Sequence, residues 1–280
     1  MMNHPLVSVI IPTYNRAWTL EAAVDSVLAQ EYPNVELLVV DDGSTDETPA
    51  LLGRYEGAIR VLTIKNGGVS RARNHGIAAS TGEFIAFLDS DDSWLPGKLT
   101  EQVGFFEKNP DALICQTEEI WIRNGKRVNP CKHHKKPSGD IFEASLHLCL
   151  VSPSAVMMRR SLFDAVGLFD ESLPACEDYD LWLRIASRYP VYTTPSPLVV
   201  KHGGHDDQLS KTPLLDRFRI QSMVRLLEGE ALSEHQKEAT LAVLQKKGRI
   251  YTGGCLKHGR EEEAETITRM VEKALQATSS

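Results

Sequence analysis

The first 90 residues alternate between short apolar runs and amphipathic stretches, and this alternation restricts the fold more than any other feature. Two of the apolar runs, Leu6–Ile11 and Val35–Val40, are rich in β-branched residues, which is typical of strands buried on both faces. The stretches between them repeat apolar residues at helical spacing. Strand, helix and strand in this order predict right-handed crossovers and a mainly parallel sheet. The predicted strands are Leu6–Ile11, Val35–Val40, Ile59–Ile64 and Phe84–Leu88, and the helices between them include Leu20–Leu28 and Ser70–Ser80.

The remainder of the chain divides into a mixed part and a helical part. Between 110 and 205 we expect strands at Leu113–Ile122, Ala155–Arg159 and Leu198–Lys201, and a helix over Tyr179–Arg188. Beyond about 212 the periodicity becomes helical throughout. The predicted helices are Leu214–Glu228, Ser233–Lys247 and Glu261–Gln276, the last two forming a hairpin through the 253–259 region. We therefore expect one domain over residues 1–210 and a helical extension over 211–280.

Polar motifs follow three of the predicted parallel strands. They are Pro12–Arg16, Asp41–Asp46 and Asp89–Asp92. Ligands of open α/β sheets bind beyond the carboxyl ends of the strands, so these motifs mark the expected site. The first motif has no G-x-G-x-x-G, which argues against a dinucleotide site of the usual kind.

The segment Asp89-Ser90-Asp91-Asp92 places three carboxylates within four residues at the end of a buried strand. Their mutual repulsion is relieved by a hard divalent cation such as Mg²⁺ or Mn²⁺, which takes carboxylate and phosphate oxygens. The alternative is a capping role, in which Asp91, Asp92 or Ser93 caps a helix beginning near Pro96. Capping needs only one acid, so the pattern favours metal binding.

Three further motifs have both a binding and a structural interpretation. An aspartate at Asp41-Asp42 would accept a hydrogen bond from a pyrimidine base. The structural alternative is a capping box of Ser44 and Glu47, or an N-cap at Asp46 because of Pro49. Tyr14 would stack on a base or simply pack. Arg73, in the stretch that begins at Asn66, would pair with a phosphate or form a surface ion pair.

The pair Glu177-Asp178 stands at the start of a predicted helix. Such acids often only complement the helix dipole, but the same dipole would keep an aspartate ready to accept a proton. His202 follows the last predicted strand, where it would bind a metal or a phosphate, or serve as a structural histidine. Cys131 with His133 and His134 resembles a metal cluster, but it lies in a lysine-rich stretch, Lys126–Lys136, which we expect to be a solvated loop rather than a surface for an anionic acceptor or a membrane.

Taken in order, these motifs resemble family 2 glycosyltransferases. The resemblance rests on Pro-Thr-Tyr-Asn-Arg, Asp-Asp-Gly-Ser-Thr-Asp, Asn-x-Gly-Val-Ser-x-Ala-Arg-Asn-x-Gly, Asp-x-Asp-Asp and Glu-Asp-Tyr-Asp-Leu-Trp-Leu-Arg. It covers residues 5 to 205 and leaves the last 70 or so outside. It implies a GT-A fold, which is a Rossmann-like, mixed and mainly parallel sheet flanked by helices, here with a C-terminal helical extension. It also implies inverting transfer from a nucleotide diphosphate-sugar.

The resemblance further implies a role for each motif residue. Asp178 is expected as the catalytic base, with Glu177 assisting it. Asp91 is expected to bind Mn²⁺ or Mg²⁺, and His202 to close on the metal or the diphosphate. The remaining positions are expected to contact the nucleotide, with Asp42 on a uracil: Pro12, Tyr14, Asp42, Asn66, Arg73, Asp89 and Ser90.

The composition limits the classes of molecule that the chain is expected to bind. The net charge of −7 disfavours general nucleic-acid binding. No signal peptide and no apolar run long enough to span a membrane is apparent. We therefore expect a cytoplasmic protein that contacts the membrane at its inner face at most. We also expect it to transfer single sugars rather than to polymerise them. The five scattered cysteines predict free thiols. The expected acceptor is a carbohydrate, lipid-linked or other hydroxyl compound of bacterial surface glycan synthesis, and the C-terminal helices are a candidate homodimer contact.

Two rival functions share parts of this pattern. A sugar nucleotidyltransferase would use a similar sheet and acid pair, but it usually has a glycine-rich basic loop where this chain has Pro12–Arg16. A non-catalytic nucleotide-sugar-binding module is disfavoured because Asp91 and Asp178 are both present.

Overall fold

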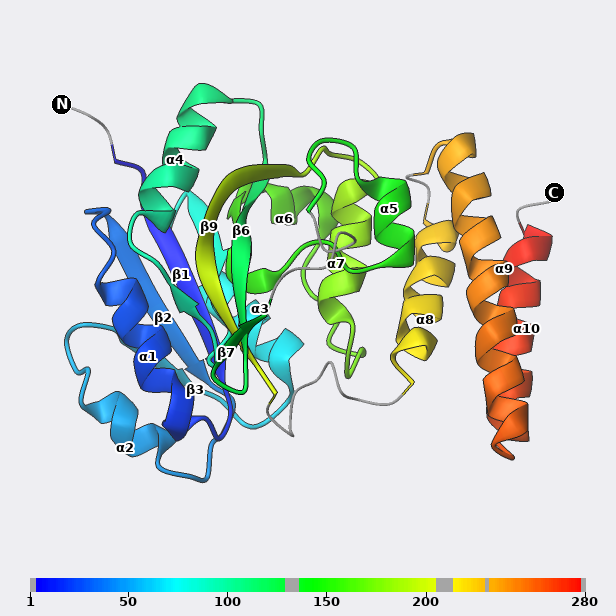
Figure 1. Ribbon diagram of the computed structural model, residues 1–280, viewed down its shortest axis with the longest axis horizontal. Helices are drawn as coiled ribbons and strands as arrows, with labels where there is room; N and C mark the ends of the chain where they lie inside the picture. Colours follow the sequence, from blue (N-terminus) through cyan, green and yellow to red (C-terminus); the bar gives the residue numbers. More distant parts are fainter. Residues whose placement is uncertain (1–3, 129–135, 205–213, 230–231, 278–280) are drawn as a thin grey trace.

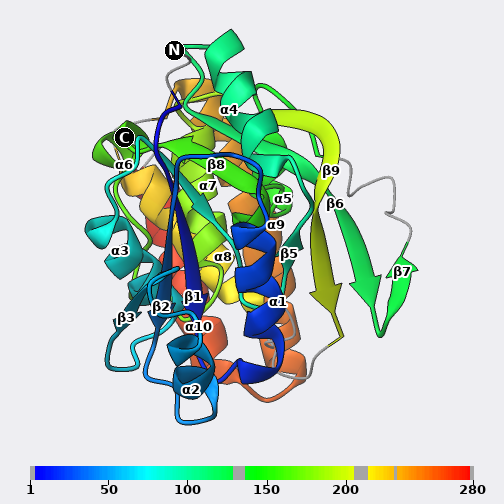
Figure 2. The same cartoon turned by 90° about the vertical axis from the view of Figure 1, so that its left-hand side faces the viewer.

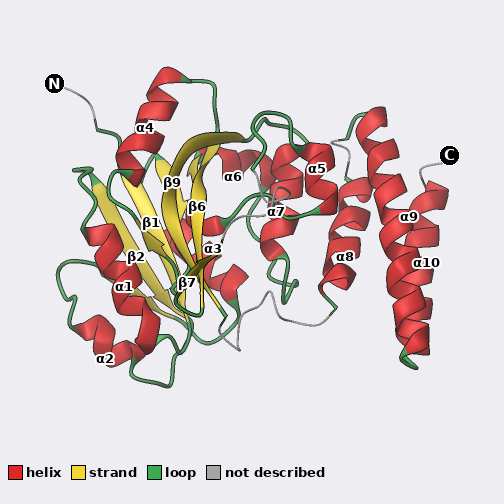
Figure 3. Ribbon diagram, in the orientation of Figure 1, coloured by secondary structure: helices red, strands yellow, loops and turns green. Residues whose placement is uncertain are grey.

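The computed structural model describes residues 4–128, 136–204, 214–229 and 232–277. A nine-stranded mixed sheet lies between two helical layers (Figures 1 and 3). Its strands are β1 (Val7–Thr13), β2 (Val35–Asp41), β3 (Arg60–Thr63), β4 (Phe84–Phe87), β5 (Ser93–Trp94), β6 (Ile114–Arg123), β7 (Lys126–Val128), β8 (Val156–Arg159) and β9 (Tyr192–Gly203). The helices are α1 (Ala17–Leu28), α2 (Thr48–Gly53), α3 (Val69–Ala79), α4 (Lys98–Lys108), α5 (Phe142–His147), α6 (Ser161–Val166), α7 (Glu177–Ala186), α8 (Leu215–Glu228), α9 (Glu234–Lys257) and α10 (Glu261–Ala277).

The strand order is β3-β2-β1-β4-β8-β6-β9-β5, with β7 paired to β6. The first four strands are parallel, and β6 and β9 run in the same direction as them because β8 is antiparallel to both β4 and β6. The carboxyl ends of β1, β2, β4, β6 and β9 therefore meet at one edge of the sheet. The expected mixed, mainly parallel sheet flanked by helices is confirmed.

The two faces of the sheet build separate cores. One buries residues of α1, α2 and α4 against side chains such as Val9 and Val39. The other joins side chains such as Ile10 and Val40 to α3, α5, α6 and α7, and continues without a break into α8, α9 and α10. Every residue of β1 and β4 is buried, which explains why their sequences are mostly apolar.

The C-terminal helices lie on the far side of the α7 layer from α1 (Figure 1). The predicted hairpin of two helices is present, but its first helix ends at Lys257 rather than Lys247, so that prediction was wrong by ten residues. Gly248, Gly253 and Gly254 are helical and do not end it. None of the described helices is long and apolar enough to cross a lipid bilayer.

Candidate active site

The loop after β2 is shaped by Asp42. Both carboxylate oxygens of Asp42 accept backbone N–H bonds, from Gly67 at 2.9 Å and Gly68 at 2.8 Å. Asn66 Nδ2 donates to the Asp42 carbonyl at 3.1 Å. Gly43 has φ +77°, and a Cβ there would lie 3.0 Å from the backbone nitrogen of Asn66, so only glycine fits. Asp42 is buried and, in this structure, organises the 66–68 loop.

The predicted capping box at Ser44 is absent. Ser44 Oγ instead accepts the backbone N–H of Asn15 at 2.9 Å, and α2 begins at Thr48 after an Glu47 N-cap. This bond ties the loop after β1 to the loop after β2. Pro12 is buried at the end of β1, whereas Tyr14 is 45% exposed. The tyrosine ring is therefore available to a ligand.

Residues Asp89–Asp92, here called the acidic turn, form a tight turn closed by the Asp92 N–H to Asp89 carbonyl bond of 3.0 Å. The capping alternative is wrong, because α4 begins only at Lys98 with Gly97 as its N-cap. Ser90 is buried within the turn, and Asp91 is half-buried. The three carboxylates have different surroundings.

Asp92 is a structural acid of the turn. Its Oδ2 accepts from Ser154 Oγ at 2.6 Å and lies 3.1 Å from Lys201 Nζ, and its Oδ1 accepts the backbone N–H of His202 at 3.2 Å. Burial raises its pKa to about 7 despite Lys201, with Asp89 and Asp91 contributing to the rise. Asp92 thus fastens the end of β9 to the acidic turn.

Asp89 lies between two cations. Its Oδ1 accepts from Arg73 Nη2 at 2.8 Å, and its Oδ2 lies 3.7 Å from Lys201 Nζ. Burial would raise the pKa of Asp89, but Arg73 and Lys201 outweigh it and hold the pKa below its ordinary value. Asp91 receives no hydrogen bond from any other described residue, and burial together with Asp89 raises its pKa.

Arg73 joins the acidic turn to the helix that carries the predicted base. Its Nη1 donates to Glu177 Oε1 at 2.7 Å while Nη2 serves Asp89, and the guanidinium carbon lies 5.1 Å from the centre of the Phe169 ring. The arginine is 3% exposed, so the surface ion pair considered for it is wrong. Burial alone would lower its pKa, but Asp89 and Glu177 together raise it. Arg73 therefore holds the two halves of the site together.

The pair Glu177-Asp178 begins α7, so both acids lie in its first turn rather than before it. Cys176 is the N-cap, in the left-handed conformation with φ +61°. Burial and the adjacent Asp178 raise the pKa of Glu177, against the effect of Arg73. Asp178 is half-buried, and its Oδ1 accepts the backbone N–H of Tyr179 at 2.6 Å. Backbone N–H groups at the helix start stabilise its negative charge.

A second connection between the two halves is the segment 149–154. Cys149 Sγ at one end donates to Asp178 Oδ2 at 3.5 Å. Ser154 at the other end contacts the acidic turn through its hydroxyl, which also accepts the Asp89 backbone N–H at 3.1 Å. The predicted base and the predicted metal ligand thus belong to one site, although 87 residues separate Asp91 from Asp178 in the chain.

Lys201 is the residue of this site that the sequence reading missed. Its Nζ contacts Asp92, Asp89 and Ser152 Oγ, the last at 3.1 Å, and these acids raise its pKa although burial would lower it. The available signal was its position, one residue before His202 at the end of a strand. Strand alternation places the His202 side chain on the opposite face of β9 from Lys201, and its role as a metal ligand stays a prediction.

The donor atoms fit a divalent cation that completes its shell with substrate. Asp91 offers a carboxylate that accepts no hydrogen bond from another described residue, beside Asp89. Within the described residues no three His, Cys, Asp or Glu side chains form a closed metal cage. Mg²⁺ and Mn²⁺ sites of one or two carboxylates with phosphate oxygens need no such cage.

Two other expectations have plain outcomes. Cys115, Cys149, Cys176 and Cys255 are free, as expected, and Cys131, His133 and His134 lie outside the described residues. The expected solvated loop over Lys126–Lys136 is wrong at both ends. Its first three residues form β7, and Lys136 is buried with Nζ 3.1 Å from Glu119 Oε1.

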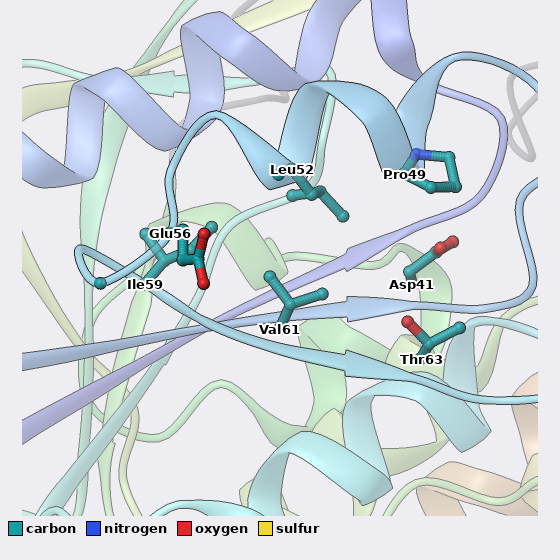
Figure 4. A pocket seen from close by; sticks show the side chains of 9 residues that line it. Asp41, Pro49, Leu52, Glu56, Ile59, Val61 and Thr63 are labelled. Carbon is teal, nitrogen blue, oxygen red and sulfur yellow. The ribbon is translucent and has the colours of Figure 1, made fainter.

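A cavity of about 400 Å³ lies between α2 and the strands β2 and β3 (Figure 4). Asp41 and Thr63 line it together with Pro49 and Leu52. Asp41 is the last residue of β2, and its Oδ1 accepts the backbone N–H of Ser44 at 2.9 Å. The cavity therefore reaches the carboxyl end of β2.

Comparisons with known proteins agree with this geometry. Residues 8–167 match the model of glycosyl transferase family 2. An uncharacterized glycosyltransferase of Rickettsia typhi is 34% identical over 87% of this chain and 80% of its own length. Three other Rickettsia glycosyltransferases are longer, and the chain covers 31–35% of each. The UDP-Glc:α-D-GlcNAc-diphosphoundecaprenol β-1,3-glucosyltransferase WfaP of Escherichia coli is 34% identical over 65% of this chain and 71% of WfaP.

Solved structures show the same fold. Residues 1–349 of TarS from S. aureus, in complex with UDP-GlcNAc, superpose with a TM-score of 0.78 at 18% identity, covering 96% of this chain and 81% of that one. The mannosyltransferase PcManGT of Pyrobaculum calidifontis, with GDP-Man and Mn²⁺, gives 0.57 at 19% identity, covering 98% and 81%. The fold is GT-A-like, with helices added at the C-terminus. The chain is a glycosyltransferase and belongs to glycosyl transferase family 2.

Proposed function

We propose that this glycosyltransferase moves a single sugar from a nucleoside diphosphate-sugar, a UDP-sugar in the first instance, to an acceptor hydroxyl with inversion at the anomeric carbon. The observation that carries the proposal is the Arg73 bridge, which brings the start of α7 beside the acidic turn. A carboxylate able to take a proton thereby adjoins carboxylates suited to a metal–diphosphate. The alternative function, a sugar nucleotidyltransferase, is not supported by the match to glycosyl transferase family 2.

The donor is proposed to lie across the carboxyl ends of β1, β2 and β4. Tyr14 offers an exposed ring for a base, and the 66–68 loop held by Asp42 forms the adjacent wall. The resemblance implies that Asp42 contacts a uracil directly. In that case the Asp42 carboxylate accepts a hydrogen bond from the base in addition to those from the backbone N–H groups of Gly67 and Gly68. Asp91 would hold Mn²⁺ or Mg²⁺ with Asp89 nearby, and the bound ion would supply charge neutralisation to the departing diphosphate.

Asp178 is proposed to take the proton of the acceptor hydroxyl. The acceptor oxygen then forms a bond to the anomeric carbon, and the bond from that carbon to the diphosphate breaks with its electron pair leaving on the diphosphate. Glu177 has a positioning role in this step, because the ion pair between its carboxylate and Arg73 fixes the start of α7. General-base assistance of this kind typically contributes about 10²–10⁴ in rate.

Replacing Asp178 with Asn tests the base. We expect kcat to fall about 10²–10⁴-fold with little change in donor affinity, because the side chain keeps its size and loses its proton affinity. Sugar transfer is measured with the preferred donor, and donor binding by calorimetry. Asp164, an exposed acid of α6, provides the control as Asp164→Asn. Turnover of Asp178→Asn close to wild type would refute the assignment.

A thermal-shift screen with UDP, GDP, dTDP and CDP tests the donor and the metal. A ligand at 100 times its Kd stabilises the folded protein by about 2.7 kcal/mol. We expect one diphosphate to raise the melting temperature in Mn²⁺ and to lose this effect in EDTA or in Asp91→Ala. Stabilisation that survives both changes would exclude the metal from donor binding.

The acceptor is proposed to be a lipid-linked saccharide of bacterial surface glycan synthesis, met at the membrane surface by a peripheral protein. This proposal is supported by the names of two Escherichia coli relatives, WfaP and WfgD, which act on a GlcNAc-diphosphoundecaprenol. WfgD is 37% identical over 66% of this chain. Transfer to an extracted lipid-linked acceptor, with water-soluble saccharides as the comparison, measures the preference.

A further inference from the structure

The strands β6 and β7 form a hairpin that the sequence reading did not find. Asn124 and Gly125 connect the strands, with φ +50° and +73°. Two consecutive positive φ values in a two-residue loop are the type I′ geometry, for which Asn-Gly is a preferred sequence. The hairpin projects from the body of the protein at the active-site edge of the sheet (Figure 2).

One face of this hairpin carries an aromatic residue and two cations. Trp121 pairs with Val128 and Arg123 with Lys126, so all four side chains lie on the same face. Arg127 pairs with Ile122 and lies on the opposite face. We call the first four residues the Trp121 face.

The Trp121 face continues into the active site. Across the parallel pairing of β6 and β9, Trp121 stands opposite Lys201, whose Nζ lies 5.7 Å from the centre of the indole ring. Lys201 in turn contacts Asp89 and Asp92. The Asn124 backbone N–H donates to the Gly203 carbonyl at 3.3 Å, which fixes the hairpin tip to the end of β9. A ligand on the Trp121 face therefore adjoins the acidic turn.

The face is exposed and positively charged. Trp121 is 39% and Val128 41% exposed, and Arg123 and Lys126 are exposed without an ion pair to any described residue. Residues 121–128 contain three cations and no acid, in a chain whose net charge is −7. A fold needs neither an uncovered tryptophan nor this local concentration of positive charge.

We infer that the Trp121 face is the acceptor subsite and that it recognises a saccharide carrying a diphosphate ester. This inference rests on the proposed function. The apolar face of a pyranose ring packs on the exposed indole, and Arg123 and Lys126 bind the diphosphate oxygens. The polar turn Asn124-Gly125 lies outermost, with the apolar pair behind it, which suits a ligand lying along the face rather than insertion of the tip into a bilayer.

Direct binding tests the subsite. The probes are the hexyl diphosphate ester of GlcNAc and hexyl GlcNAc without the diphosphate, titrated by calorimetry into the full chain saturated with UDP and Mn²⁺. We expect the diphosphate to bind about tenfold more tightly than the neutral glycoside, and the double variant Arg123→Ala/Lys126→Ala to lose this preference. Trp121→Ala should weaken both probes about tenfold, and Trp121→Phe should recover part of the loss.

Arg127→Ala is the matched control, because it removes one cation from the same hairpin on the opposite face. It should bind both probes as wild type does. Equal affinity of wild type for the two probes, or an equal loss in Arg127→Ala, would overturn the inference. So would co-sedimentation with phosphatidylglycerol vesicles that depends on Arg127 as much as on Arg123, because this indicates a bilayer surface. Retained UDP stabilisation in every variant separates failure of the subsite from failure of the proposed function.

Discussion

Arg73 shows how a buried charge serves the site at the scale of one residue. It is confined between Asp89 and Glu177, and its removal leaves the buried Glu177 carboxylate without its cation, while Asp89 keeps only Lys201 at 3.7 Å. Removing one partner of a buried ion pair typically costs about 3–5 kcal/mol. We expect Arg73→Met to lose free energy of unfolding of this order, measured by urea denaturation.

Arg73→Met in a Glu177→Gln background tests whether the unpaired carboxylate causes the loss of stability. Arg73→Met combined with Glu177→Gln should recover part of the lost stability, because the uncompensated carboxylate is then absent. Arg71→Met, two residues earlier in α3, is the control and should stay within about 1 kcal/mol of wild type. A double variant no more stable than Arg73→Met would contradict the electrostatic explanation.

Lys98 is a buried cation outside the active site. Its Nζ donates to Gln102 Oε1 at 2.6 Å and lies 4.0 Å from the centre of the Trp94 ring, and burial lowers its pKa to about 7. Below pH 7 both the folded and the unfolded chain carry this proton. Between pH 7 and the ordinary lysine pKa of 10.5 the unfolded chain binds more protons, so this group makes stability rise with pH.

Lys98→Met should abolish that contribution. The difference in free energy of unfolding, wild type minus variant, is expected to grow by about 1 kcal/mol per pH unit between pH 7 and 9 in urea titrations. Lys108→Met, at the exposed end of α4, should leave the pH profile of the wild type unchanged. Parallel profiles for wild type and Lys98→Met would show that Lys98 keeps an ordinary pKa.

At the scale of the element, α9 contains glycines with opposite surroundings. No described heavy atom lies within 4 Å of the position of a Cβ on Gly253, whereas a Cβ on Gly248 would lie 3.0 Å from Val271 Cγ2 of α10. Alanine is favoured over glycine within a helix by about 1 kcal/mol. Gly253→Ala should therefore raise the melting temperature by about 2–4 °C.

Gly248→Ala should lower the melting temperature instead, because it pushes α10 away from α9. Calorimetric scans of the two variants under one set of conditions compare them directly. The opposite signs on one helix distinguish packing from helix propensity. A rise in both variants would mean that the contact with α10 yields without loss.

Strands were predictable from the sequence where burial on both faces requires a run of apolar residues. The strands β1, β2 and β4 are buried on both faces and were located to within two residues. The strand β9 was found only over its last part, because its first half contains two prolines. The Asn124-Gly125 turn lies between the predicted strand Leu113–Ile122 and the predicted loop Lys126–Lys136, and no hairpin was predicted there.

The residue types of the site were predictable, but not their connections. Acids at strand ends and at a helix start follow from local pattern. The Arg73 bridge, the Lys201 contacts and the segment 149–154 depend on the packing of parts distant in sequence, which no local period encodes. Arg73 therefore suggested a phosphate ligand in the sequence and is a bridge between carboxylates in the structure.

At the scale of the whole molecule, the C-terminal helices share a core with the helix that carries the proposed base. The α8 helix packs between α7 and α9, and one continuous buried cluster contains Trp182 of α7 and Leu244 of α9. The boundary at residue 210 therefore marks a change in sequence pattern, and one hydrophobic core contains residues from both sides of it. Residues on both sides of it should unfold together.

Leu244→Ala tests this cooperativity. Leu244 is fully buried, and truncation of such a leucine typically costs about 2–5 kcal/mol. All four tryptophans (Trp18, Trp94, Trp121 and Trp182) precede residue 210, so their fluorescence reports only the first part, whereas far-ultraviolet circular dichroism also reports α9 and α10. We expect both signals to shift to lower temperature together, by several degrees. If the extension folds independently, the circular dichroism transition moves and the tryptophan transition stays where it is in the wild type.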